Sequence, residues 1–304
     1  MSATATINGP IIRATGLLVI EVINSNPNGD PDRESDPRQR PDGKGEISPV
    51  SFKRKVRDLI ENKDGDVWKQ LASDLKPEHF AILESRDRGF KELTTDAAWK
   101  KVLETIEQNQ MKTRYWDARV FGCTFLENED SGEGKAKKDR KYIRTGVAHF
   151  GLGVSVAPID IERHTNTKMA GAEEGKDRGM APMGYRFVPH GVYWMPFFVN
   201  PSAAQKSGCT KRDIELLLKV IPFAYPHTRS HARPMVEVRH AWYIEHKNAL
   251  GSCSDFALIG ALTPKKKQDL NSPSNSWDDY DVPTELPADL KARVGSCRDL
   301  MTEM

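Results

Sequence analysis

Hydroxyl and basic side chains gather immediately after residue 47 in a pattern that suits phosphate binding. The set comprises Ser48, Ser51, Lys53, Arg54 and Arg57. The N-terminus of a helix carries free N–H groups and the positive end of the helix dipole, and it therefore attracts anions. Lysine and arginine side chains placed there would add full positive charges. An ordinary solvated helix face would carry the same residue types, and both interpretations stay open on spacing alone.

The segment before this helix is a 24-residue loop, 24–47, that is rich in Asn, Pro, Gly and Asp. Its carboxylates could hold a hard cation, and they are Asp30, Asp32, Asp36 and Asp42. A calcium or magnesium site needs several oxygens at fixed spacing, but NPNGDPDRESD does not match the EF-hand pattern, and Arg33 and Arg38 interrupt it. Turn chemistry explains these residue types without a metal. We expect neither a metal nor another cofactor.

Two other segments combine cations with aromatic or flexible apolar side chains. In DARVFG, residues 117–122, Arg119 and Phe121 could hold extended RNA by phosphate pairing and base stacking. A structural Asp–Arg pair beneath a strand fits that spacing equally well. Residues 163–186 hold many glycines, methionines and charges, which predicts a projecting arm that could clamp a nucleic-acid strand. A plain surface loop is the alternative, and the candidate residues of the arm are Arg163, Lys168, Met169, Arg178 and Met180.

Signals for catalysis are weaker. His227 and His231 have the spacing of a helical zinc pair, but no glutamate follows His227 and a third ligand is not evident. The sequence contains no GxSxG, no Walker phosphate loop and no GxGxxG. We therefore predict no catalytic residues.

The whole chain has the composition of a globular protein, with 38% hydrophobic and 29% charged residues among 304. Its formal net charge of +2 means that any surface for a polyanion must be local. No apolar run reaches the roughly 18 residues that a membrane span needs, and residues 1–10 lack the features of a signal peptide. The four cysteines are far apart and indicate reduced thiols in a cytoplasmic protein.

The elements that must position these residues can be read from periodicity. Ser48 and Pro49 predict a helix start, and Phe52, Val56 and Leu59 begin one apolar stripe. Strands are expected at 17–23, 187–199 and 235–245, extended chain at 145–161, and a second apolar helix at 213–224. We expect irregular chain at 24–47, mostly helix at 66–112, an irregular start becoming strand at 115–126, and a polar tail ending in helix at 265–304. This order predicts an α+β layer fold.

The sequence resembles the CRISPR Cascade backbone subunit, Cas family seven, of the Csd/Csh type found in type I systems. The similarity lies in LLVIEVINSNPNGDP at 17–31, SPVSFKRKVRDLI at 48–60 and DARVFG. The order that follows also matches: a Gly/Met-rich arm, FVPHGVYW, an apolar helix and HTRSHARPMVEVRHAWYIEHKN. The resemblance covers most of residues 15–262.

The resemblance implies one domain over residues 1–304 with a modified RNA-recognition-motif, or ferredoxin-like, palm. The palm would comprise 15–62, 113–160 and 187–262. A helical insertion, 63–112, would form the fingers, a β-hairpin, 161–186, the thumb, and 263–304 a C-terminal tail.

The resemblance also implies a function without catalysis. Several copies would polymerise along one CRISPR guide RNA and present it for pairing with target DNA in antiviral defence, beside a Cas family five subunit and large and small subunits. Asn26 and Asn28 would contact sugar or phosphate, and Arg229 and Arg233 would lie at the palm edge. The alternative is a metal-dependent RNase of the type III kind, using Asp30, Asp32 or Asp36.

Overall fold

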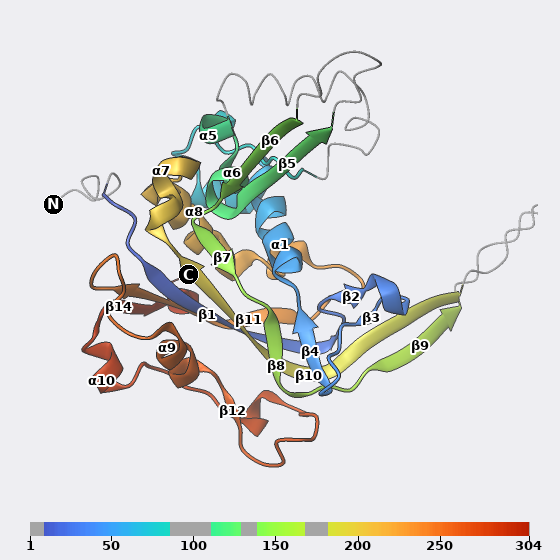
Figure 1. Cartoon of the computed structure of the whole chain (residues 1–304). Helices are drawn as coiled ribbons and strands as arrows, with labels where there is room; N and C mark the ends of the chain where they lie inside the picture. Colours follow the sequence, from blue (N-terminus) through green and yellow to red (C-terminus); the bar gives the residue numbers. More distant parts are fainter. Residues whose placement is uncertain (1–8, 86–110, 129–138, 168–181, 304) are drawn as a thin grey trace, which may run out of the picture.

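The computed structural model describes residues 9–85, 111–128, 139–167 and 182–303. These residues form a mixed α/β fold around one large antiparallel sheet (Figure 1). The predicted α+β fold class is therefore confirmed as far as helices packed on an antiparallel sheet. Among the described residues, no helix is both long and apolar enough to cross a membrane.

The sheet is centred on β1, Ala14–Ser25, which contains the predicted strand at 17–23. It pairs antiparallel with β10, Pro182–Val199, on one side and with β11, Val236–His246, on the other. The run LLVIEVI suits this place because β-branched side chains pack well on a pleated surface that is buried on both faces. The full strand order is β14-β11-β1-β10-β8-β4. The edge strands are β4 Lys44–Ile47 and β14 Val294–Asp299, and β8 Gly153–Pro158 lies between β10 and β4. A short strand, β7 Ala148–Phe150, also pairs with β10.

Helices cover one face of the sheet (Figure 1). Leu18, Ile20 and Val22 of β1 belong to the core cluster that also contains the apolar stripe of the predicted helix. That helix, α1, spans Pro49–Glu61, and the second predicted helix is α8, Lys211–Val220. Two short helices join the same cluster: α2, Asp66–Leu71, and α6, Trp116–Phe121.

The C-terminal part of the chain covers the opposite face of the sheet. Leu17 and Val19 of β1 pack in a second core cluster with Leu258, Tyr280 and Leu286. The elements on this side are α9 Asp255–Leu262, β12 Lys265–Lys266, β13 Tyr280–Asp281 and α10 Ala288–Lys291. The prediction of a helical end to 265–304 is wrong, because α10 is one turn long and β14 then pairs with β11.

Two hairpins extend from this framework (Figure 1). One pairs β9, Glu162–Thr167, with the first part of β10. These two strand segments are the described part of the arm predicted at 163–186. The other joins β5, Gly122–Asn128, to β6, Asp139–Thr145, and the sequence predicts a strand only for the first of these.

Two local predictions need correction. DARVFG is helical, because Trp116–Phe121 forms α6 and the chain turns into β5 at Gly122, whose φ of +83° suits glycine. The loop 24–47 is also more regular than expected. It contains β2 Gly29–Asp30, the 3-10 helix η2 Pro31–Arg33, β3 Asp36–Pro37 and then β4. The segment predicted as mostly helix contains α2, the 3-10 helix Pro77–His79 and α5, Met111–Arg114, whereas 72–76 and 80–85 are not helical and 86–110 lie outside the described residues.

Candidate nucleic-acid interface

The loop after β1 is attached to the start of α1 by side-chain hydrogen bonds. Asn28 Oδ1 accepts from the Ser48 backbone N–H at 2.8 Å, and Asn28 Nδ2 donates to the Gly29 carbonyl at 3.0 Å. Ser48 is the predicted N-cap, and its Oγ accepts from the Ser51 N–H at 3.2 Å. We call this hydrogen-bonded loop the joint, and it holds the end of β1 beside the start of α1. The amide of Asn28 is therefore already used inside the fold.

Asn26 lies deeper in the same joint. Its side chain is buried, and its Nδ2 donates to the Ser35 carbonyl at 2.8 Å. Arg233 Nε donates to the Asn26 carbonyl at 2.9 Å, which brings one predicted palm-edge arginine to this loop. Among the described atoms, Asn26 Oδ1 is buried and accepts no hydrogen bond. Arg229 is exposed four residues before Arg233, so its side chain is available to an external anion.

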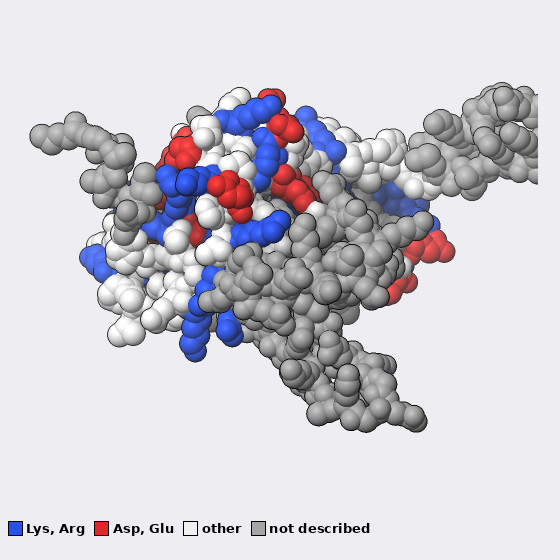
Figure 2. All heavy atoms as spheres, turned by 90° about the horizontal axis from the view of Figure 1, so that it is seen from above, with Lys and Arg blue, Asp and Glu red and all other residues white. Residues whose placement is uncertain are grey.

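The first turns of α1 carry cations at the surface. Lys53 is half-buried, and its ammonium lies 5.1 Å from the centre of the Phe121 ring. Burial, and then the charge of Arg57, lower the pKa of Lys53 below its ordinary value. Arg54 donates to the Glu84 carbonyl at 2.5 Å and lies 3.7 Å from Asp58. Figure 2 shows that basic and acidic side chains alternate on the described part of the helical side, so the charge there is mixed.

Arg57 points inward from the same helix. Its side chain is 4% exposed, and its guanidinium makes two contacts at 3.0 Å, from Nε to Asp117 and from Nη2 to Glu84. Asp117 is 1% exposed and also accepts from the Leu83 N–H at 2.7 Å. Such a buried charge depends on its partners. Arg57 therefore joins α1 to the segment 83–84 and to α6.

Arg119 forms a second buried ion pair. Its Nη2 and Nε lie 2.7 and 3.2 Å from the two carboxylate oxygens of Asp213. Asp213 also completes the capping box of α8 with Thr210. Phe121 packs edge-on against Trp116, with ring centres 5.3 Å apart, and is buried. The structure therefore favours the structural alternative for DARVFG: its arginine and its phenylalanine hold α6 against α8 and the core.

The acidic loop meets arginines of the β9–β10 hairpin. Asp36 Oδ2 lies 2.5 Å from Arg163 Nη2, and Asp36 Oδ1 lies 3.1 Å from Arg163 Nε. Asp30 Oδ1 caps η2 by accepting from the Asp32 N–H at 3.2 Å. Among the described residues there is no group of three or more His, Cys, Asp or Glu arranged to hold a metal. Asp30 thus shapes the turn, and Asp36 pairs with an arginine of the hairpin.

Other predicted residues and some unexpected ones complete the region. Lys168, Met169, Arg178 and Met180 lie outside the described residues. Sequence reasoning missed Glu84, which contacts Arg57, and His149, whose pKa is lowered by burial and then by the nearby charge of Lys53. No sequence motif marks either residue as part of the site, because each is a lone polar residue whose partner is distant in sequence.

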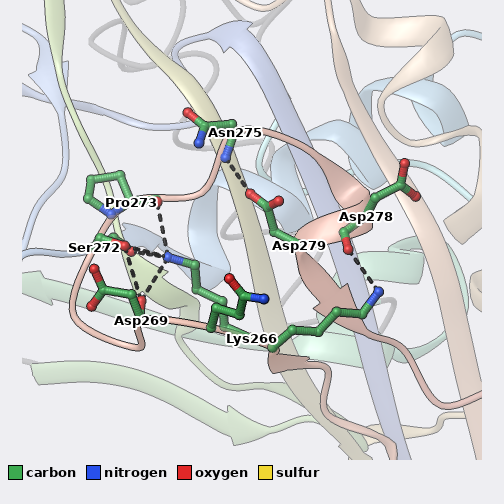
Figure 3. A pocket seen from close by; sticks show the side chains of 9 residues that line it. Lys266, Asp269, Ser272, Pro273, Asn275, Asp278 and Asp279 are labelled. Carbon is green, nitrogen blue, oxygen red and sulfur yellow. Dashed lines mark hydrogen bonds between the residues drawn. The ribbon is translucent and has the colours of Figure 1, made fainter.

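A separate polar pocket lies in the C-terminal part of the chain, with a volume of about 330 Å³ (Figure 3). Lys266 Nζ donates to oxygens of Asp269, Ser272 and Pro273 at 2.6–3.0 Å. The ammonium thus fills a ring of carbonyl oxygens and ties the loop to β12. None of the residues predicted to bind RNA lines this pocket.

The fold and the site together define the class of protein. It is an α+β protein in which the capped N-terminus of α1, with cations at its surface, lies beside the β9–β10 hairpin. Such an arrangement suits a polyanion better than a small enclosed substrate. The family model described as CRISPR-associated protein Cas7 matches residues 12–285 of this chain. The chain belongs to the Cas7 family.

Comparison with solved structures gives distant similarities. A chain of a "CRISPR RNA-guided surveillance complex, pre-nicking" is 14% identical, with a TM-score of 0.44, over 76% of this chain and 77% of that one. A chain of a "CRISPR RNA-guided surveillance complex" is 15% identical, with a TM-score of 0.39, over 75% and 68%. No functionally curated protein matches the sequence.

Proposed function

We propose that this protein is a CRISPR RNA-binding backbone subunit of a type I Cascade surveillance complex. Copies of it would polymerise along the guide RNA and leave the guide bases open for pairing with target DNA in antiviral defence. The observation that carries the proposal is the family match over residues 12–285. The protein would act as a scaffold without catalysis, in the cytoplasm, beside a Cas family five subunit and large and small subunits.

The strand order supports a ferredoxin-like palm. Helix α1 follows β1 and helix α8 follows β10, and the inner strands run β11-β1-β10-β8. This order agrees with the βαββαβ arrangement of an RNA-recognition motif when the other elements are treated as insertions, and it supports the proposed palm. The fingers would be 63–112, the thumb 161–186 and the tail 263–304.

The route of the RNA would differ from that in the common RNA-recognition module. There, bases stack on aromatic side chains of the sheet surface. Here helices pack on one face of the sheet and the C-terminal segment with α9 packs on the other. The guide RNA would therefore run past the start of α1 and the root of the hairpin, where cations stand at the surface.

The predicted site residues would have different roles in this arrangement. Lys53, Arg54 and Arg229 would contact phosphates, with Ser48 and Ser51 at the helix start. Arg57, Arg119 and Phe121 would support that surface from beneath, because their side chains are buried. Asn26, Asn28 and Arg233 would shape the adjoining loop. The remaining predicted contacts are Arg163, Lys168, Met169, Arg178 and Met180 on the thumb.

The test is co-expression with a CRISPR guide RNA and its genomic neighbours, followed by purification. RNA should copurify with a multimer whose mass increases with the length of the guide. Loss of all RNA at moderate salt would overturn the proposal. Magnesium-dependent cleavage of target RNA that disappears in Asp30→Ala would instead establish the nuclease alternative.

A further inference from the structure

The root of the β9–β10 hairpin carries two arginines that face each other across the strands. We define the root as Glu162 and Arg163 of β9 with Arg186 and Phe187 of β10. Arg163 is the direct antiparallel partner of Arg186. Like charges at directly opposite positions destabilise a strand pair. An anion placed beside the two guanidinium groups would relieve their repulsion.

Asp36 supplies that anion from the loop after β1. Its carboxylate makes the paired contacts with Arg163 described above and also lies 3.5 Å from Arg186 Nη1. The hydrogen bond from Arg163 is the first cause that holds the pKa of Asp36 below its ordinary value. One carboxylate thus stands against both opposed cations.

The turn before Asp36 is shaped for the same contact. Glu34 and Ser35 both adopt left-handed backbone conformations, with φ of +49° and +67°, which is unusual for residues other than glycine. The Glu34 carbonyl and carboxylate accept hydrogen bonds from Arg186. Strained backbone persists only where its surroundings hold it in place. Arg186 of the hairpin root thus helps to hold this turn, together with Asn26, which donates to the Ser35 carbonyl.

The same loop is rigidly joined to α1. β3, which contains Asp36, pairs with β2, and the residue before β2 is Asn28, which holds the Ser48 N–H. Figure 1 shows β2 and β3 between the start of α1 and the hairpin. A continuous set of contacts therefore runs from the hairpin root through Asp36 to the first turn of α1.

We propose that Asp36 is a positioning residue that fixes the direction of the β9–β10 hairpin relative to α1, and thereby the regular spacing of copies along a bound RNA. The part concerning RNA rests on the function proposed above. Neutralising Asp36 leaves Arg163 without its paired carboxylate and opposite Arg186, which keeps, among the described residues, only the exposed Glu34 carboxylate, so the hairpin root loosens while the surface cations of α1 stay in place.

The experiment compares Asp36→Asn, Arg163→Gln and the double variant with the wild-type protein. Hydrogen exchange of the free protein reports on the backbone amides of the hairpin root, and nuclease protection of the complex reports the RNA footprint. We expect Asp36→Asn to speed exchange at the root and to lose the regular footprint, with RNA still retained at moderate salt. Adding Arg163→Gln removes the opposed charge and should restore slow exchange and a footprint like that of Arg163→Gln alone.

Asp32→Asn is the matched control, because it makes the same change in the same loop at an exposed side chain. Exchange and footprint of Asp36→Asn equal to those of this control would overturn the inference. If Asp36→Asn does not fold, recovery of folding in the double variant supports it and absence of recovery overturns it. If wild-type protein protects no RNA, the proposed function fails, while the exchange data still decide the role of Asp36.

Discussion

The side-chain oxygen of Asn28 accepts a hydrogen bond from the backbone N–H of Ser48 across twenty residues of sequence, at a distance of 2.8 Å. Ser48 in turn caps α1, so a turn residue after β1 fixes where the helix begins. The loop between them is therefore the joint of the candidate site. The strand end, the first turn of α1 and the hairpin root all meet at it.

Asn28→Ala should destabilise the protein. The change removes a buried acceptor and leaves the Ser48 N–H without this partner, which typically costs about 1–3 kcal/mol. Urea unfolding followed by circular dichroism measures the free energy of unfolding. Asn275→Ala, at an exposed position, is the control and should stay within about 0.5 kcal/mol of the wild type. Equal stabilities of the two variants would show that the joint is unimportant for folding.

Arg119→Met should have a large effect on stability. It leaves the Asp213 carboxylate, 1% exposed, without its cation, and breaking a buried pair in this way costs about 3–5 kcal/mol. Arg212→Met is the matched change on α8, since Arg212 and Asp74 form an exposed pair, 41% and 63% exposed. It should change stability by less than about 1 kcal/mol. Comparable denaturation midpoints for both variants would contradict the structural role of Arg119.

Lys53 should make RNA binding depend on pH below the ordinary pKa of lysine. Burial lowers its pKa in the free protein, whereas a bound phosphate favours the charged ammonium. RNA binding would then take up a proton, and affinity should fall as pH rises through the lowered pKa. Fluorescence anisotropy with a single-stranded guide RNA measures this dependence.

Two variants at the same position separate charge from shape. Lys53→Arg keeps its charge across this range, so it should bind RNA with a flatter pH profile. Lys53→Ala should lower the slope of log affinity against log salt by about 0.7, the value for one phosphate contact to a single strand. A pH profile of Lys53→Arg identical to that of the wild type would exclude Lys53 as the titrating group.

Lys63 should make folding stability rise with pH above neutrality. Burial lowers its pKa from 10.5 to about 7, and its Nζ donates to the carbonyls of Ile60 and Phe80 at 2.6 and 2.9 Å. Between these two pKa values the unfolded chain binds more protons than the folded one, so the free energy of unfolding increases with pH. Below pH 7 the penalty for the charged group is fully present.

The measurement is the difference in unfolding free energy between wild type and Lys63→Met, taken from about pH 7 to about pH 10. That difference should shift in favour of the wild type as pH rises. Lys69→Met, an exposed lysine on α2, is the control and should give a difference independent of pH. A flat difference for Lys63→Met as well would refute the lowered pKa.

Much of the framework follows from local sequence. The run at 17–23 and the capped stripe beginning at Ser48 identify β1 and α1, because buried β-branched residues and a hydroxyl–proline start act within a few residues. The C-terminal end was mispredicted because 294–299 becomes a strand only by pairing with β11. DARVFG was mispredicted because its short helix is held by Arg119 and Asp117 pairing with distant residues.

The sequence by itself determined the main strands and helices, the residue types of the candidate site, and a resemblance that agrees with membership of the Cas7 family. Only the tertiary structure decided which of the cations are enclosed by carboxylates. Lys53 and Arg57 are four residues apart on one helix, yet Lys53 is only half-buried, whereas Arg57 is enclosed by Asp117 and Glu84. The reason is physical, because a buried charge is stable only beside its counter-charge. The counter-charges of Arg57 are Glu84 and Asp117, which lie 27 and 60 residues further along the chain (84 minus 57 and 117 minus 57), so local sequence could not place them.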